Sequence, residues 1–206
     1  MNMTKSRMWA DYLHFFQAGL MRHSQTGSLI PSQRFLIDAM IAPIPKDYTG
    51  QILELGAGTG PLTVRLVDKC PNARVHACEI NPALAQYARE NLAAAGANGN
   101  VQVHTMRAQD FLAKFNEDTT EKSGFVISGL PLGNLERSEV LDILKASSRA
   151  MRPDGMFIQA QHFLVDRKNV RSVFGELRTL PVFRNVPPIF VYYAKKSPRQ
   201  DGPTSA

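Results

Sequence analysis

Cysteine, tryptophan and long apolar runs are all scarce in this sequence of 206 residues. Cys70 and Cys78 are its two cysteines, and neither belongs to a CxxC pair or lies beside a histidine cluster. We therefore expect no disulfide framework, no metal site and a reducing, cytoplasmic location. Every apolar stretch is interrupted well before the roughly 18 positions that a membrane-spanning helix requires, so we expect a soluble or peripheral protein.

The N-terminal residues also lack the uninterrupted apolar segment and cleavage site of a secretory signal, so secretion is not expected. A hydrophobic fraction of 44% is ordinary for one globular domain with a buried core. The formal net charge of +6 favours a polyanionic partner, either nucleic acid or an anionic membrane surface. A solvated basic surface without a partner explains the same charge, and composition alone does not choose among the three.

Two helices are expected ahead of the main sheet. In residues 6–22, Trp9, Phe15 and Phe16 fall with other apolar residues on one arc, and charged or polar residues lie opposite. A second helix is expected from Pro31 to about Ile41. An aromatic-rich amphipathic helix with nearby basic residues can lie in a lipid interface, although packing on its own domain is the commoner use of such a helix.

From Gln51 onward, strands and helices alternate. The expected strand–helix pairs are 51–55 with 61–69, 73–79 with 82–95, 101–106 with 109–115, and 125–128 with 136–150, the last helix being ended by Pro153-Asp154-Gly155. Further on we expect a strand at 156–162, a helix at 168–177, and strands at 182–186 and 189–194. The alternation predicts a parallel sheet between helices, and Pro187-Pro188 predicts a closing antiparallel hairpin because it leaves no room for a crossover. The predicted fold is therefore α/β: a Rossmann-like seven-stranded sheet, mostly parallel with a reversed last strand at its edge, preceded by two helices.

The strongest motif is a glycine-rich turn, Gly56-Ala57-Gly58-Thr59-Gly60, between the first strand and its helix. Glycine is needed where the chain turns sharply and must approach a ligand closely. Glu79 ends the second strand, where a carboxylate can accept both hydroxyls of a ribose, and Asp110 follows the third, where it can meet an adenine amino group. All three features lie at carboxyl ends of adjacent strands, the place where open α/β sheets bind ligands.

Other nucleotide sites fit this turn less well. The dinucleotide pattern GxGxxG/A would put its third glycine at Pro61, and no P-loop pattern occurs. The turn with its acidic strand ends instead resembles the class I S-adenosylmethionine-dependent methyltransferases. The resemblance implies S-adenosylmethionine as cofactor, held by Thr26, Gly27, Glu54, Gly56, Ala57, Gly58, Gly60, Glu79, Ile80, Gln109, Asp110 and Ser128.

The fourth strand leads into Ser128-Gly129-Leu130-Pro131-Leu132, where this superfamily places its substrate-facing loop. Adenine-N6 methyltransferases usually have Asn-Pro-Pro-Tyr or Asn-Leu-Pro-Tyr here, and their aromatic residue stacks on a flipped base. Ser128 stands in place of that asparagine and Leu132 in place of that aromatic residue, which argues against a nucleobase as the substrate.

A narrower resemblance rests on this loop together with Phe15-Phe16 and the segment 23–32, His-Ser-Gln-Thr-Gly-Ser-Leu-Ile-Pro-Ser. These segments are similar to those of the bacterial phospholipid N-methyltransferases that act on phosphatidylethanolamine, with the ornithine-lipid N-methyltransferases as close neighbours. The resemblance spans about residues 8–195 and implies methylation of a lipid head-group amine towards phosphatidylcholine. Gly133-Asn134 departs from the pattern after the loop.

Transfer from a sulfonium to an amine depends mainly on positioning, but the amine must first lose a proton. His23 and Tyr12 are the candidate catalytic groups, and His23 could equally be a helix cap. We expect the membrane and substrate side to comprise Trp9, Phe15, Phe16, Leu130, Pro131 and Leu132. The expected partners are an anionic membrane surface at the inner face of the membrane and an amine-bearing lipid, with no stable nucleic-acid partner.

We expect the chain to divide into an N-terminal amphipathic helix and substrate-side lid at 1–48, a methyltransferase domain at 49–196 and a tail at 197–206 that is disordered because it contains Pro, Gly and Ser and lacks apolar periodicity. The competing function is rRNA adenine-N6 dimethylation, which the basic charge favours. Two features argue against this function: Leu132 stands in place of the aromatic residue, and we expect no added RNA-binding region after the last strand. A binder that has lost catalysis should show erosion of the glycine turn, which is intact.

Overall fold

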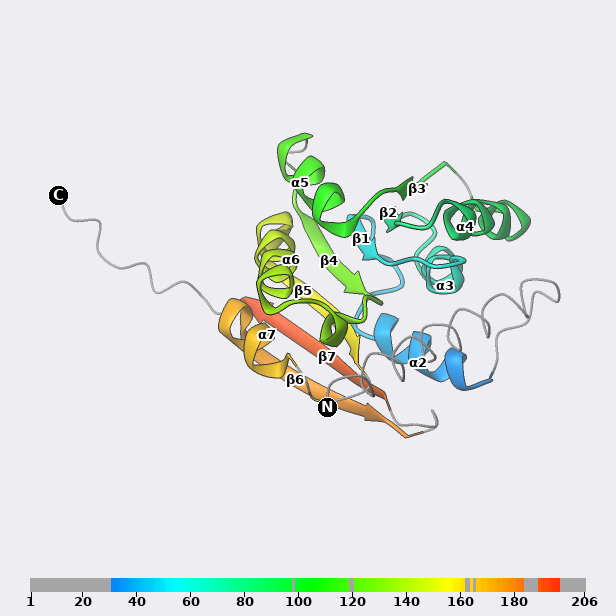
Figure 1. Cartoon of the computed structure of the whole chain (residues 1–206). Coiled ribbons are helices and arrows are strands. Elements are labelled where there is room, and N and C mark those ends of the chain that lie inside the picture. Colours follow the sequence, from blue (N-terminus) through cyan, green and yellow to red (C-terminus); the bar gives the residue numbers. More distant parts are fainter. Residues whose placement is uncertain are drawn as a thin grey trace, which may run out of the picture.

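The computed structural model describes residues 31–97, 99–118, 121–161, 164, 166–183 and 189–196. Its centre is a seven-stranded sheet in the order β3-β2-β1-β4-β5-β7-β6 (Figure 1). The strands are β1 Gln51–Leu55, β2 Arg74–Glu79, β3 Val101–Thr105, β4 Ser123–Ser128, β5 Met151–Gln161, β6 Gly175–Val182 and β7 Ile189–Lys196. Neighbours from β3 to β5 pair in parallel, whereas β7 is antiparallel to both β5 and β6. The predicted fold class is confirmed.

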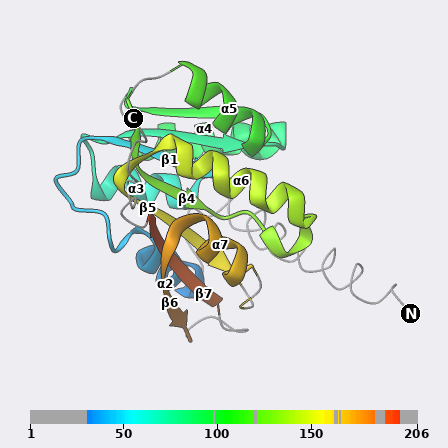
Figure 2. The ribbon, with the colours of Figure 1, turned by 90° about the vertical axis from the view of Figure 1, so that its left-hand side faces the viewer.

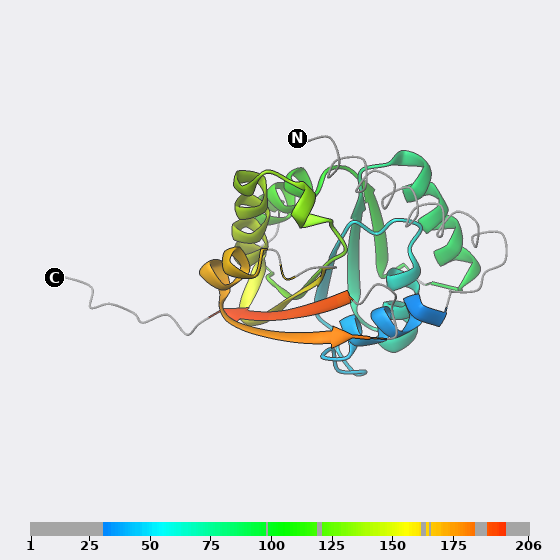
Figure 3. The ribbon, with the colours of Figure 1, turned by 60° about the horizontal axis from the view of Figure 1, so that its bottom comes forward.

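Helices cover both faces of the sheet (Figures 2 and 3). They are α2 Pro31–Ile41, α3 Pro61–Lys69, α4 Pro82–Ala94, α5 Ala108–Asp118, α6 Arg137–Ala150 and α7 Arg167–Phe174, with a 3-10 turn, η1, at Leu132–Asn134. The side chains of strand β1 divide between the two hydrophobic cores, one on each face of the sheet. Leu53 and Leu55 pack into the core under α5, α6 and α7, and Ile52 packs into the core under α2 and α3, because successive side chains of a strand point to opposite faces.

The last part of the chain differs from the sequence-based expectation. The helix expected at 168–177 ends at Phe174, where Gly175 adopts a φ of 82° and begins β6. The sixth strand is therefore Gly175–Val182 and not 182–186. Charged Glu176 and Arg178 alternate with less polar residues along this strand, and this period of two is typical of a strand and not of a helix.

Two further corrections concern strand position. The reversed strand β7 is not at the edge of the sheet, because it inserts between β5 and β6. Strand β5 begins at Met151, so Pro153-Asp154-Gly155 lies within the strand and does not separate it from α6. The pairing of β4 with β5 shifts between Ser123 and Phe125, and this irregularity accommodates the proline.

Parallel pairing brings the carboxyl ends of β1 to β5 to one edge of the sheet. Strand β6 runs in the same direction as β5, since both are antiparallel to β7. Helix α2 packs against the neighbouring sheet face, where the Tyr193 hydroxyl donates to the Ala39 carbonyl at 2.7 Å. Among the residues that the structure describes, no helix is long and apolar enough to cross a membrane.

Candidate functional site

The glycine-rich turn at the end of β1 depends on backbone conformations that other residues rarely adopt. Gly56, Gly58 and Gly60 have φ values of 78°, 59° and 85°. A Cβ at Gly60 would lie 3.1 Å from the Cβ of Ala88, and a Cβ at Gly56 would lie 3.0 Å from a methyl carbon of Leu130. The turn can therefore pack this closely against α4 and the loop after β4 only with glycine at these positions.

Hydrogen bonds fix the turn on the neighbouring strand and helix. The backbone amides of Gly56 and Ala57 both donate to the carbonyl of Cys78 on β2, at 2.9 and 3.0 Å. The side-chain amide of Asn91 on α4 donates to the Thr59 carbonyl at 2.9 Å. This anchoring holds the turn rigid before a ligand arrives, which reduces the entropy cost of binding.

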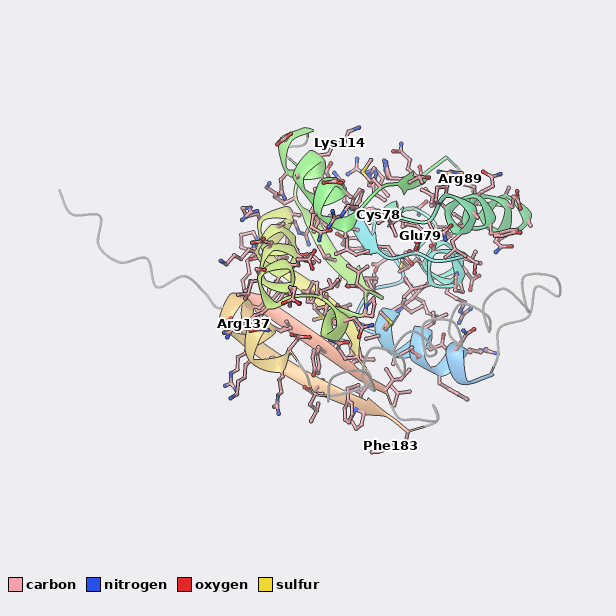
Figure 4. The ribbon with its side chains drawn as sticks, viewed as in Figure 1. Cys78, Glu79, Arg89, Lys114, Arg137 and Phe183 are labelled. Atoms are coloured by element: carbon pink, nitrogen blue, oxygen red, sulfur yellow. The ribbon has the colours of Figure 1, made fainter. Side chains whose placement is uncertain are left out.

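Glu79 lies at the end of β2 (Figure 4), and backbone amides orient its carboxylate. One oxygen accepts the Gly58 amide and the other accepts the Asn81 amide, each at 2.9 Å. Each oxygen keeps further lone-pair capacity, so the carboxylate can still accept the two hydroxyls of a ribose. The next residue, Ile80, is 63% exposed and offers an apolar surface to the flat face of a base.

Glu54 lies beneath the turn, on the face of β1 that is covered by α3. Its side chain is buried and accepts a hydrogen bond from the Thr63 hydroxyl at 2.7 Å. Burial raises the pKa of Glu54 to about 7, the Thr63 hydrogen bond opposes this shift, and the charge of Glu79 adds to it. A positively charged ligand bound above the turn would favour the ionised form of Glu54.

The third strand contributes through the start of α5. The amide of Met106 donates to the Glu79 carbonyl at 3.0 Å, which holds the end of β3 beside the end of β2. Asp110 is exposed in the first turn of α5, and Gln109 precedes it. The glycine turn, the oriented carboxylate and these polar groups suit an adenosyl group with a cationic sulfur attached.

The loop after β4 forms the other side of this edge. The buried Ser128 hydroxyl accepts the Leu130 amide at 3.3 Å, and Gln159 on β5 donates to the Leu130 carbonyl at 2.9 Å. Pro131 is exposed, whereas Leu132 is fully buried in the core below the loop. Leu130 and Pro131, not Leu132, are therefore the apolar members of this loop with exposed surface.

Several expected site residues lie outside the described residues, so the roles predicted for them stay predictions. They are the candidate catalytic residues Tyr12 and His23, the lid residues Thr26 and Gly27, and the apolar residues Trp9, Phe15 and Phe16.

Sequence reasoning did not find four residues that shape the site: Thr63, Asn81, Asn91 and Gln159. Asn81 could have been identified, because it precedes Pro82 and its side chain caps the start of α4. Gln159 stands in the apolar stretch Phe157-Ile158-Gln159-Ala160, and a polar residue in a buried strand signals a specific hydrogen bond. Thr63 and Asn91 lie within α3 and α4, where a single polar residue gives no comparable signal.

Comparison with known proteins identifies relatives of this chain. The family described as "Methyltransferase domain" matches residues 52–155. The ornithine lipid N-methyltransferase of Singulisphaera acidiphila is 28% identical over 187 residues, which is 90% of this chain and 96% of the relative.

Solved structures share the fold. An O-methyltransferase from Bacillus cereus, solved in complex with SAH, has a TM-score of 0.63 at 17% identity, with 88% of each chain covered. A precorrin-6y C5,15-methyltransferase from Geobacter metallireducens has a TM-score of 0.62 at 18% identity, covering 82% of this chain and 92% of that chain. At such identities the likeness extends to the fold alone.

Proposed function

Because the chain belongs to the methyltransferase-domain family and uses S-adenosylmethionine as its methyl donor, we propose that it methylates the head-group amine of a membrane lipid. The lipid is phosphatidylethanolamine, converted towards phosphatidylcholine, or an ornithine lipid. The observation that carries this proposal is the likeness to the Singulisphaera enzyme, which extends over nearly the whole of both chains. The protein would work in the cytoplasm, peripherally bound to the inner face of the membrane.

S-adenosylmethionine, when bound, supplies an electrophilic methyl group on a positively charged sulfur. In the proposed reaction Glu79 orients the ribose, and the Glu54 carboxylate lies beneath the positive charge. The loop 128–132 orients the acceptor amine in line with the transferred methyl, so that positioning supplies most of the rate enhancement. Tyr12 and His23 are the proposed proton acceptors for the amine.

The exposed apolar residues at the carboxyl edge support a membrane-facing orientation. Phe183, which follows β6, is 74% exposed (Figure 4), and Leu164, which lies between β5 and α7, is 49% exposed. Strands β5 and β6 end at the same edge as the glycine turn. A membrane lying against this edge would bring lipid head groups close to the cofactor site.

An rRNA adenine-N6 dimethyltransferase is the competing function, and the net charge of +6 supports it. The burial of Leu132 in the core weighs against it. Neither Leu130 nor Pro131 offers an aromatic ring on which a flipped adenine could stack.

Expression in a bacterium that makes phosphatidylethanolamine but no methylated lipids tests the proposal, with a second host that also makes ornithine lipid. We expect new mono-, di- or trimethylated head groups in the lipid extract of one host or both. Unchanged lipids together with new dimethyladenosine in ribosomal RNA would overturn the proposal in favour of the competing function.

A further inference from the structure

A surface pocket of about 360 Å³ lies apart from the glycine turn, beside the N-termini of α6 and α7. Its lining residues are Arg137, Leu164, Asp166, Arg167, Lys168 and Asn169. Three of the six are cations and one is a carboxylate. The pocket therefore carries a net positive charge in a concave surface, which is the arrangement that attracts a small anion.

The carboxylate in the pocket offsets one of the three positive charges, but it forms no ion pair with these cations. One oxygen of Asp166 accepts the Gln161 side-chain amide at 3.3 Å, and the other accepts the Asn169 side-chain amide at 3.0 Å. Within the part of the chain that the structure describes, the ion pairs involve other residues, and none includes Arg137, Arg167 or Lys168. The positive charge of the pocket is thus available to a ligand.

The start of α7 adds hydrogen-bond donors to the same pocket. Asp166 is the N-cap of this helix, but its side chain makes no capping hydrogen bond to the first turn. The first backbone amides of a helix have no partner within the helix, and they favour an anion. Helix α6 differs, since Glu136 and Glu139 form a capping box at its start. The cations and the uncapped amides of α7 both favour an anionic ligand.

The pocket lies next to the loop that faces the cofactor site. Arg137 begins α6 shortly after the loop 128–132, and Figure 4 shows it at the α7 end of that helix. Gln161, which holds Asp166, lies two residues after Gln159, and Gln159 holds the Leu130 carbonyl. Since β1, β4 and β5 are consecutive in the sheet and α7 packs over β7 and β6 beyond them, the pocket lies on the β5 side of the glycine turn.

We propose that this pocket binds the anionic group of the lipid whose amine is methylated. The inference rests on the proposed function. Phosphatidylethanolamine has a phosphodiester and ornithine lipid a carboxylate, each a few bonds from its amine. Binding that anion at Arg137, Arg167 and Lys168 directs the amine towards the loop 128–132 and the methyl donor. Amines without a neighbouring anion are then poor substrates, and Leu164 at the pocket contacts the apolar part of the lipid.

The test is steady-state methyl transfer on vesicles of phosphatidylcholine, which carry no net charge and so limit general attraction. Three amine lipids are offered separately: phosphatidylethanolamine, ornithine lipid, and a long-chain amine without an anionic group. The pocket variant is Arg137→Gln with Lys168→Gln. The matched control is Lys114→Gln with Lys145→Gln, which removes the same charge from exposed positions on α5 and α6 away from the pocket.

We expect the pocket variant to raise KM for the anion-bearing lipids roughly tenfold, the effect of losing charge-assisted hydrogen bonds. Its kcat, its affinity for S-adenosylhomocysteine and its KM for the simple amine should match those of the control. A rise confined to one lipid identifies a phosphodiester or a carboxylate as the ligand. If the wild type is active and the pocket variant has an unchanged KM, the anion site is overturned and the proposed function stands. If the wild type transfers methyl to none of the lipids, the proposed function is overturned as well.

Discussion

At the scale of single residues, Glu54 links pH to stability. Its pKa is about 7 in the folded chain and 4.5 when unperturbed, so between these values the folded state binds a proton that the unfolded state has lost. Stability therefore falls as pH rises through this window, by about 3 kcal/mol when the change is complete. We expect Glu54→Gln to remove most of this loss, as measured by urea unfolding from pH 4.5 to 8. An identical pH dependence in the variant would contradict this assignment.

Gly60 tests whether close packing of the turn matters beyond its backbone conformation. Gly60 and Gly96 both have positive φ, but only at Gly60 would a Cβ meet another residue, Ala88. We expect Gly96→Ala to lower stability by about 1 kcal/mol and to leave cofactor affinity unchanged. Gly60→Ala should cost more stability and weaken S-adenosylhomocysteine binding at least tenfold in calorimetry. Equal effects of the two substitutions would show that packing against α4 is unimportant.

The sequence predicted which residues of the described region form the glycine turn and the acidic end of β2, because these features depend on local chain geometry; their contacts with the cofactor stay predictions. The glycines at 56, 58 and 60 and the acidic residue at position 79 form a motif that can be recognised in the sequence alone. The Thr63 hydrogen bond to Glu54 and the Gln159 hydrogen bond to Leu130 depend on tertiary contacts between segments that the sequence does not bring together.

At the scale of elements, the clearest predictions concerned segments with strong boundary signals. Strand β1 and helix α3 begin and end where the sequence predicted, because the glycine turn separates them and a proline starts the helix. The start of β6 was mispredicted because α7 passes directly into it at Gly175, without a loop between the two elements. The insertion of β7 between β5 and β6 could not be predicted, since a hairpin pattern does not say which strand lies at the edge.

The loop after β4 gives a prediction at this scale. Gln159 is fully buried, and its side-chain amide nitrogen donates to the carbonyls of Leu130 and Ala160. Its side-chain amide oxygen, Oε1, has no hydrogen-bond partner in the described structure. Gln159→Met keeps a similar volume and releases the loop. We expect kcat to fall several-fold in methyl transfer while S-adenosylhomocysteine affinity is kept. Gln102→Met, at an exposed position on β3, is the control, and loss of activity in both variants would contradict a role in positioning the loop.

At the scale of the whole molecule, one edge of the sheet gathers the glycine turn, the loop 128–132 and the basic pocket. The exposed Phe183 lies at the same edge. The sequence predicted this convergence in outline, since parallel strands place their carboxyl ends together. It did not predict the pocket, because Arg137 and Arg167 come from separate helices that meet only in the folded chain.

The proposed membrane association also belongs to the scale of the whole molecule, and flotation with vesicles tests it. The net charge of +6 should bind the protein to anionic vesicles more strongly than to uncharged ones. Salt shortens the reach of electrostatic attraction, so binding should weaken as ionic strength rises to about 1 M. Equal binding to both vesicle types at low salt would show that charge does not direct the protein to membranes.

The central claim is that S-adenosylmethionine donates a methyl group to a lipid amine at this site. The most direct measurement follows labelled methyl from S-adenosylmethionine with purified protein, amine-lipid vesicles and undermodified ribosomal RNA in one reaction. Glu79→Gln in parallel links any transfer to this site, since an amide cannot accept both backbone amides that Glu79 binds. The account predicts label on the lipid head-group nitrogen with wild type and at least tenfold less with the variant. Label in RNA and none in lipid would contradict it.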